Sequence, residues 1–228
     1  MRPITKFKLL TALFFTVATA PSLFAQSKAD IFDSSKPITW LGVDYSLTKF
    51  IGIATNTSLT FSPWTVVSSR DNGTVGNDEF RDSFTAQWNQ LFLEKPKQFD
   101  IAKAVHRSSV TYTIDVATKA NATLTKKDFF SNNPGDFKTL TEQNISDAVK
   151  NYNFQGNTGI GLLFFVEGMS KGVAQEGVWI TFVDMGSKTV LFTTYEAEKP
   201  GGSGFLNYWA TPLRTIVKKM ESDFYKWK

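Results

Sequence analysis

The chain has 228 residues, of which 42% are hydrophobic and 20% charged, and its formal net charge is +4. This composition supplies enough apolar surface for a packed core and excludes a wholly disordered chain. Cysteine is absent, and His106 is the single histidine. These two counts exclude disulfide frameworks, iron–sulfur clusters, thiolate zinc sites, cysteine nucleophiles and multi-histidine metal sites within one chain. We therefore expect no metal and no cofactor.

The first 25 residues have the three-part layout of a secretory signal peptide. Arg2, Lys6 and Lys8 give it a positive start, an apolar stretch follows over Leu9–Ala20, and the segment ends in a small residue, Ala25. The apolar stretch is shorter than the roughly 20 residues that a membrane-spanning helix needs. We expect cleavage after Ala25 and export to the periplasm or the extracellular space. The alternative is an uncleaved anchor or a buried helix.

Removal of this segment leaves the chain nearly neutral. It holds three of the 25 basic residues and no acidic residue, so residues 26–228 carry 22 basic and 21 acidic side chains. Nucleic-acid binding depends on concentrated basic charge, so we expect no nucleic-acid partner. Residues 26–36 are polar and serine-rich, which indicates a flexible leader. The sequence then predicts one domain over 37–228, with no transmembrane segment.

Alternation of apolar and polar residues predicts the first strand. Between Pro37 and Phe50 the alternation puts Leu41 and Val43 on one face and Asp44 on the other. The further elements expected before residue 155 are an edge strand or loop over 59–68, a helix capped by Asn77 that stops near Pro96, a strand over Val110–Val116, and a helix that follows Thr139 and Glu142 in capping-box spacing.

The last seventy residues carry the clearest pattern. Gly159–Val166 is apolar on both faces, which indicates a central strand covered on two sides. Gly177–Val183 and Thr189–Glu196 flank a turn and are typical of a hairpin. Leu206–Lys226 has an apolar stripe at helical spacing. Because proline suits the first helical position, we expect the regular helix to begin at Pro212.

The expected order of elements is strand, helix, strand, helix, three strands, helix. A late antiparallel meander followed by a returning helix favours an α+β fold over a doubly wound parallel one. We therefore expect a mainly antiparallel sheet of about five strands, packed against three helices and ending in a β-meander and a C-terminal helix.

A glycine-rich loop precedes the last helix, in the segment Lys199–Phe205. Backbone N–H groups of a loop at a helix N-terminus bind anions, so the loop is a candidate ligand site. It fits neither the Walker A spacing nor the dinucleotide fingerprint. The alternative is that the glycines permit a tight turn and close packing of the helix. The candidate ligand-binding residues are Gly201, Gly202, Gly204, Asn207 and Tyr208.

Two carboxylates are candidate catalytic residues: Asp44 inside the first strand and Glu167 at the end of the apolar strand. A pair of carboxylates at a suitable separation serves as acid and base in glycoside hydrolysis. Trp179 or Tyr208 would then stack on sugar rings. The alternative is that Asp44 accepts structural hydrogen bonds and that Glu167 is exposed at a strand end.

The remaining chemistry-bearing residues favour structural roles. The oxygen-rich stretch over 71–79 does not match the EF-hand pattern, and turn and capping roles explain it. His106 is expected at the surface. Trp64, Trp179 and Tyr208 are candidates for an exposed aromatic patch, which would mark an interaction surface.

Three stretches carry a resemblance: Trp-Leu-Gly-Val-Asp at 40–44, Gly-Ile-Gly at 159–161, and the run over 201–209. They resemble an uncharacterised family of signal-peptide-bearing Gram-negative envelope proteins of unknown function. The resemblance spans most of residues 26–228 and implies a periplasmic or surface location, and it transfers no catalytic role. The ending is also similar to small α+β modules of envelope assembly lipoproteins, although this chain lacks their anchoring cysteine.

These observations predict a non-enzymatic envelope module that binds a protein partner or a small ligand. The alternative is a carboxylate-based hydrolase of envelope glycans that uses Asp44 and Glu167. A structural subunit of a larger assembly is a third hypothesis, because a partner could cover one face of the central strand.

Overall fold

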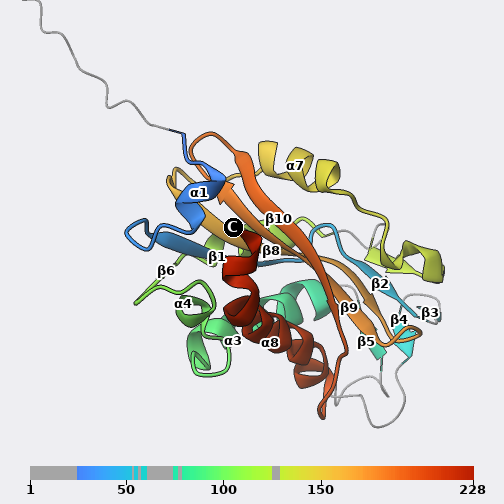
Figure 1. Cartoon of the computed structure of the whole chain (residues 1–228). Helices are drawn as coiled ribbons and strands as arrows, with labels where there is room; N and C mark the ends of the chain where they lie inside the picture. The colour runs from blue at the N-terminus through green and yellow to red at the C-terminus, as the bar shows by residue number, and fades with distance from the viewer. Residues whose placement is uncertain (1–24, 53, 56–57, 61–73, 77–78, 125–128) are drawn as a thin grey trace, which may run out of the picture.

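The computed structural model describes residues 25–52, 54–55, 58–60, 74–76, 79–124 and 129–228 (Figure 1). Residues 1–24 of the predicted signal peptide, the predicted helix cap Asn77 and the aromatic candidate Trp64 lie outside these ranges. Of the described helices, none is long and apolar enough to cross a membrane. The described residues form a sheet with helices on both faces.

The main sheet has seven strands, and a second sheet has three short ones. In the main sheet the order is β10-β9-β8-β1-β6. Beyond the end of β1, β2 pairs with the last residues of β8, and its other edge pairs with β7. The strands of the main sheet are β1 (Ile38–Asp44), β2 (Lys49–Ile51), β6 (Thr111–Tyr112), β7 (Phe130–Ser131), β8 (Ile160–Ser170), β9 (Gln175–Asp184) and β10 (Thr189–Glu198), and those of the second are β3 (Ala54–Thr55), β4 (Ser58–Thr60) and β5 (Thr74–Gly76).

The prediction of a mainly antiparallel α+β sheet is wrong. β1 pairs in parallel with β8 and β6, and β2 pairs in parallel with β8 and β7. Within the main sheet only β8, β9 and β10 pair antiparallel, as a meander that α8 follows. The fold is therefore α/β. A hairpin pattern shows that two strands that are neighbours in the chain run antiparallel. The direction of β1 relative to the distant β8 depends on the crossover connections between them, which the residue pattern of the strands does not encode.

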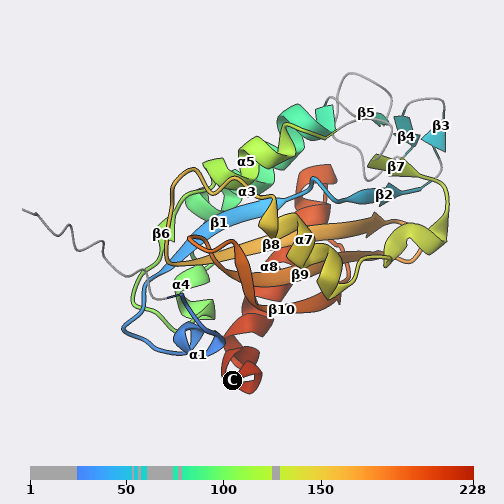
Figure 2. The ribbon, with the colours of Figure 1, turned by 90° about the horizontal axis from the view of Figure 1, so that it is seen from above.

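Helices cover both faces of the sheet, as Figure 2 shows from above. One face carries α3 (Thr85–Glu94), α4 (Ile101–Ala104) and α8 (Phe205–Asp223), and the other carries α5 (Asp115–Asn121) and α7 (Glu142–Lys150). The remaining helical segments are α1 (Lys28–Ile31), a π-helix over Phe80–Phe84, and 3-10 helices over Pro134–Phe137 and Phe224–Trp227.

The apolar run in the last third of the chain forms the central strand β8, as predicted, and every residue of Ile160–Ser170 is buried. Alternate side chains of this strand enter two separate cores. Leu162 and Phe164 pack with α3, α4 and α8, whereas Leu163 and Phe165 pack with α5 and α7. A strand buried on both faces has no polar side for alternation to mark, which explains its continuous apolar sequence.

An irregularity in β1 changes the faces that simple alternation predicted. The register of β1 against β8 shifts between Trp40 and Gly42. Gly42 has a φ of +108°, a conformation that other residues rarely adopt. Beyond the shift, Val43 shares a core with Trp40, while Leu41 lies in the opposite core. A Cβ at Gly42 would lie 2.5 Å from Oδ1 of Asn89, so glycine also leaves room for that amide.

One predicted strand is partly a helix, and one predicted helix begins at another residue than expected. The predicted strand Val110–Val116 contains only the two residues of β6, and the chain enters α5 at Asp115, whose charge suits the first turn. Thr141, and not Thr139, caps α7, and its hydroxyl accepts from the Asn144 N–H at 3.3 Å. A four-position alternation is too short to separate a strand from a helix start.

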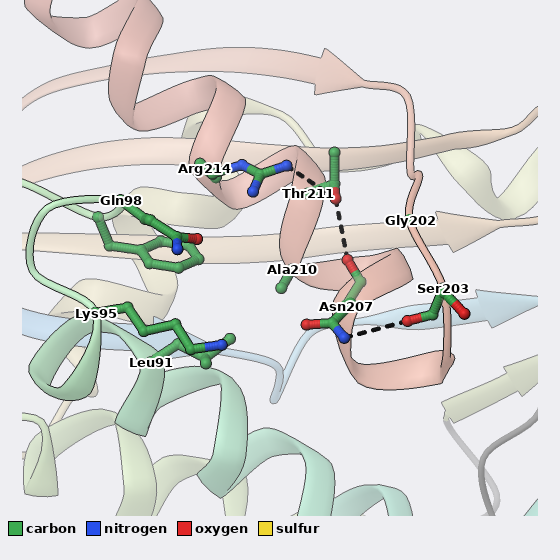
Figure 3. Close-up of a pocket in the computed structure, with 10 residues that line it drawn as sticks. Leu91, Lys95, Gln98, Gly202, Ser203, Asn207, Ala210, Thr211 and Arg214 are labelled. Atoms are coloured by element: carbon green, nitrogen blue, oxygen red, sulfur yellow. Dashed lines mark hydrogen bonds between the residues drawn. The ribbon is translucent and has the colours of Figure 1, made fainter.

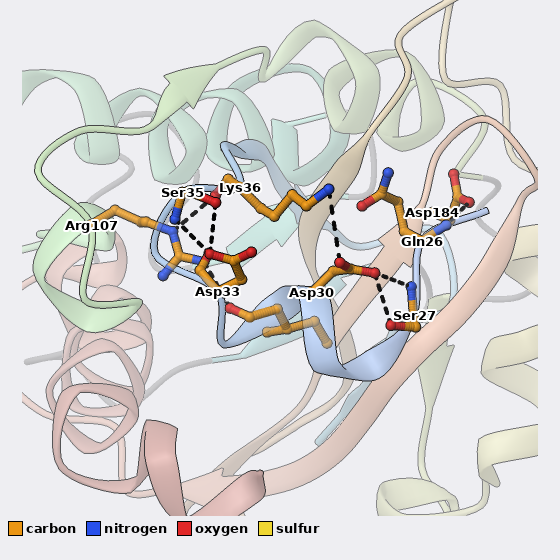
Figure 4. A network of polar contacts seen from close by, with 9 residues as sticks. Gln26, Ser27, Asp30, Asp33, Ser35, Lys36, Arg107 and Asp184 are labelled. Atoms are coloured by element: carbon orange, nitrogen blue, oxygen red, sulfur yellow. Dashed lines mark hydrogen bonds and ion pairs between the residues drawn. The ribbon is translucent and has the colours of Figure 1, made fainter. Parts of the chain in front are cut away.

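Residues 26–36, expected as a flexible leader, pack against the rest of the described chain (Figure 4). Ile31 of α1 is fully buried. The Arg107 guanidinium donates to the backbone carbonyls of Ile31, Asp33 and Lys36 at 2.8, 2.7 and 3.0 Å. One distant arginine therefore binds this polar segment through its backbone, which composition does not reveal.

Candidate functional site

A cleft lies between α8 and the end of α3 with the turn that follows it (Figure 3). Its volume is about 270 Å³. The Trp88 indole N–H donates to the Leu206 carbonyl at 2.9 Å, which fixes α3 against the start of α8. The side chains that matter for its chemistry are Leu91, Lys95 and Gln98 on one wall and Asn207, Thr211 and Arg214 on the other.

The glycine-rich loop forms a hydrogen bond with α8 at a backbone carbonyl that Pro212 leaves without a donor. α8 begins at Phe205 and continues through Pro212, so the predicted start at Pro212 is wrong. Proline has no N–H and cannot donate to the carbonyl four residues earlier, that of Tyr208. The Gly201 N–H donates to this carbonyl at 3.0 Å, and the Gly201 carbonyl accepts from the Thr211 hydroxyl at 2.7 Å. The helix thus accommodates a buried proline because the loop supplies the missing donor.

Two glycines of the loop adopt left-handed backbone conformations, with φ of +96° at Gly202 and +82° at Gly204. Gly204 is the N-cap of α8 with ψ of 152°, in a region that is essentially restricted to glycine. A Cβ at Gly202 would meet Asn207 at an ordinary 3.7 Å. Glycine is therefore required at these two positions by the backbone conformation and not by a lack of space for a Cβ atom. The tight turn, which was the alternative to a ligand site, accounts for both glycines.

Two cationic side chains face the cleft. In Figure 3, Lys95 extends from the end of α3 toward Asn207, and Arg214 lies along α8 beside Thr211. The Arg214 guanidinium is 3.5 Å from the Thr211 hydroxyl oxygen. Among the described residues, no carboxylate lines the cleft and none forms an ion pair with either cation. Uncompensated cations around a concave surface attract an anion.

The rest of the cleft combines an apolar base with amide groups. Leu91 and Phe99 are buried at its base. The Asn207 side-chain amide donates to the Ser203 carbonyl at 3.1 Å, which leaves its amide oxygen and second N–H toward solvent. Gln98 contributes a second, exposed amide. A small anion with a short carbon skeleton matches this combination of surfaces.

The structure brings only part of the predicted ligand-binding set into the cleft. Gly202 and Asn207 line it. Gly201 holds the loop on α8, Gly204 caps the helix, and Tyr208 is half-buried outside the lining.

Lys95, Gln98 and Arg214 were missed by the sequence reasoning. Arg214 had a detectable signal, because it shares one face of α8 with Asn207 seven residues earlier and Thr211 three residues earlier. Lys95 and Gln98 belong to a segment far earlier in the chain and reach the cleft through the packing of α3 on α8, which no local pattern predicts.

Asp44 is fully buried at the end of β1. One carboxyl oxygen accepts from the Tyr152 hydroxyl and the other from the Ser46 N–H, both at 2.6 Å. Burial raises the pKa of Asp44 in spite of these hydrogen bonds. Burial, with a further contribution from the charge of Asp44, also raises the pKa of Tyr152. The pair fixes Tyr152, which follows α7, on the end of β1.

Glu167 is buried rather than exposed at a strand end. One oxygen accepts from the backbone N–H groups of Thr139 and Leu140, and the other accepts from the Trp179 indole N–H at 2.8 Å. These three donors give it the role of holding the segment before α7 on the sheet. Neither Asp44 nor Glu167 lines the cleft, and the hydrolase alternative stays a prediction.

Trp179 does not contribute to the predicted exposed aromatic patch, because it is buried, and Tyr208 is half-buried. His106 is exposed, and its Nε2 lies 2.9 Å from the Glu221 carbonyl oxygen. Within the ranges that the structure describes, no group of three or more His, Asp and Glu side chains is placed to hold a metal ion.

Comparison with protein-family models found no matching family, and comparison with curated proteins found no matching protein.

Proposed function

We propose that this protein is a non-enzymatic module that binds a small anionic ligand in the cleft between α3 and α8. The observation that carries the proposal is the pair Lys95 and Arg214, which face one concave surface without an ion pair among the described residues. An anion bound between them would also accept hydrogen bonds from the Asn207 and Gln98 amides.

The ligand class follows from the size and the donors of the cleft. A volume of about 270 Å³ is close to the lower end of the roughly 300–1,000 Å³ range of small-molecule sites. Arginine binds carboxylates and phosphates through two parallel hydrogen bonds, whereas lysine acts as a point charge. Leu91 and Phe99 would contact carbon atoms. A small carboxylate or phosphate ester fits these features best.

We also propose that the protein acts in the cell envelope. The signal-peptide layout of the first 25 residues and the resemblance to envelope proteins support this location. N-terminal sequencing of the protein recovered from a periplasmic extract should begin at Gln26. Recovery of the intact precursor from the cytosol would contradict the proposal.

Isothermal titration calorimetry of the full chain with inorganic phosphate, citrate and acetate at low ionic strength tests the binding function. We expect at least one of these anions to bind, and expect R214Q and K95Q each to weaken that binding at least tenfold. Sodium chloride at 0.5 M should weaken it as well, because salt screens exposed charges. K97Q is the matched control, since Lys97 is an exposed lysine two residues from Lys95 that does not line the cleft.

Two results would contradict the proposed site. One is that none of the three anions binds at low ionic strength. The other is that K97Q weakens binding as much as R214Q does, which would indicate diffuse attraction to surface charge rather than a site.

A further inference from the structure

A second cavity lies on the other face of the sheet, beyond the end of β1. Its volume is about 450 Å³, within the roughly 300–1,000 Å³ range of small-molecule sites. Its walls come from the turn after β1, from α5 and from the C-terminal end of α7, represented by Leu47, Lys119 and Ala148. Phe165 of β8 lies at its base.

The topology of the sheet supports a binding role at this position. The connection from β1 to β6 includes α3 and α4 on one face, and the connection from β6 to β8 includes α5 and α7 on the opposite face. Since β6 and β8 flank β1, the direction of winding reverses at β1. In open α/β sheets, ligands bind in the crevice beyond the carboxyl end of a strand at such a reversal. Ser46 and Leu47 of the cavity come directly after β1.

The base of the cavity is apolar and aromatic. Val116 and Phe165 are buried there, and the Tyr152 ring meets the Phe165 ring edge-on with centroids 5.9 Å apart. The Leu47 and Ala148 side chains are partly buried against the same core. These surfaces match the aromatic body of a small ligand.

Tyr152 lies between the cavity and the buried Asp44 carboxyl. Its hydroxyl donates to Asp44 at 2.6 Å, so the ring is held in one orientation. The Asp44 carboxyl is fully buried and does not line the cavity. No other Asp or Glu of the described chain lines it either.

Lys119 provides positive charge at the rim. It is exposed on α5, and its ammonium group donates to the Gln155 amide oxygen at 2.6 Å. An ammonium group has three donors, so two remain for a ligand. Over the described ranges, Lys119 forms no ion pair.

We propose that this cavity is a second binding site, independent of the α3–α8 cleft, for a small amphiphilic anion with an aromatic apolar body and one carboxylate or sulfonate group. The apolar body contacts Tyr152 and Phe165, and the anionic group pairs with Lys119. The site goes beyond the proposed function, because it lies on the opposite face of the sheet and selects apolar area as well as charge.

The dye 8-anilinonaphthalene-1-sulfonate is a suitable probe, because it joins an aromatic body to one anion and its fluorescence rises when it leaves water. We expect the full chain to bind one dye molecule. K119Q should weaken binding at least fivefold, and A148F, which fills the cavity, should abolish it. K150Q removes an exposed lysine of α7 outside the cavity, and R214Q alters the other cleft; both should bind within twofold of the wild type.

Absence of dye binding overturns the proposal, as does binding that K119Q leaves unchanged. Loss of binding in R214Q also overturns it, because that result assigns the dye to the α3–α8 cleft. Thermal unfolding checks that A148F folds. If it does not, K119Q decides alone, since Lys119 is exposed and its replacement leaves the core intact.

Discussion

Glu176 offers the sharpest test of the energetics, because it is a buried carboxylic acid with no hydrogen-bond partner among the described residues. It lies in β9 between Met169 of β8 and Glu198 of β10, and its side chain is 0% exposed. Neither of its oxygens has a hydrogen-bond partner in the described structure. Burial raises the pKa of Glu176 well above its usual 4.5. The Tyr45 hydroxyl, whose pKa burial and the Glu176 charge raise, is also without a hydrogen bond.

The raised pKa of Glu176 makes stability fall as pH rises. Below pH 4.5 both the folded and the unfolded chain carry the proton, so the group has no pH-dependent effect. Above that value the unfolded chain releases the proton while the folded chain keeps it, which favours unfolding until pH passes the folded pKa. The limiting slope is about 1.4 kcal/mol per pH unit. This slope is an upper limit, which is reached only at pH values well above the unfolded pKa and well below the folded pKa.

Glu176→Gln removes this loss, because glutamine has nearly the same shape and does not titrate. Urea unfolding followed by tryptophan fluorescence at several pH values gives the free energy of unfolding of both proteins. The advantage of E176Q over the wild type should grow as pH rises from 5.0 to 6.5, by no more than the limiting slope of about 1.4 kcal/mol per pH unit. Glu94→Gln, at an exposed position at the end of α3, should follow the wild type. A constant difference between E176Q and the wild type over this range would show that Glu176 does not keep its proton in the folded chain.

Two further predictions concern backbone groups that side chains or loops satisfy. Asn89→Ala removes an amide that accepts from the Val43 N–H at 2.8 Å and donates to the Val43 carbonyl at 2.9 Å. The free energy of unfolding in urea should fall by about 2–4 kcal/mol. A fall below 1 kcal/mol would contradict the assigned role. Pro212→Ala restores an N–H that competes with the Gly201 N–H for the Tyr208 carbonyl. Hydrogen exchange of the Gly201 amide should therefore accelerate about tenfold. Unchanged exchange would show that other contacts hold the loop.

The parts of the fold that could be predicted from sequence are those whose cause is local. The apolar run over 160–166 marked β8, and the turn residues after Asp184 marked the β9–β10 hairpin. Strand direction beyond the meander could not be predicted, because the register of β1 against β8 depends on side chains of both strands and on the helices between them. The misassigned strand before α5 shows the same limit, since Val116 and Ala117 face the Leu41 core only once α5 has formed.

The candidate site divides in the same way. The loop could be recognised in the sequence, because a positive φ is a conformation that glycine adopts readily, as Gly202 and Gly204 do. The cationic character of the cleft could not be recognised in the sequence, because Lys95 and Arg214 come from two segments that meet only when α3 packs on α8. Asp44 is a candidate catalytic residue in the sequence, and in the structure it accepts the structural hydrogen bonds that were given as the alternative. Its buried partner Tyr152 follows α7, 108 residues further along the chain, so no spacing rule joins the two.

Both cavities lie where regular hydrogen bonding is interrupted and a cavity wall supplies the missing partner. At α8, Pro212 frees the Tyr208 carbonyl, and the loop that walls the first cleft pairs it through Gly201. At the end of β1, the amide oxygen of Asn121, the last residue of α5, accepts from the buried Tyr45 N–H at 2.6 Å, and α5 walls the second cavity. If either wall moved away, the Tyr208 carbonyl or the Tyr45 N–H would lose this partner, and a buried backbone group left unpaired costs about 1–3 kcal/mol. The walls are therefore preorganised, and a ligand entering either cavity has little ordering free energy to overcome.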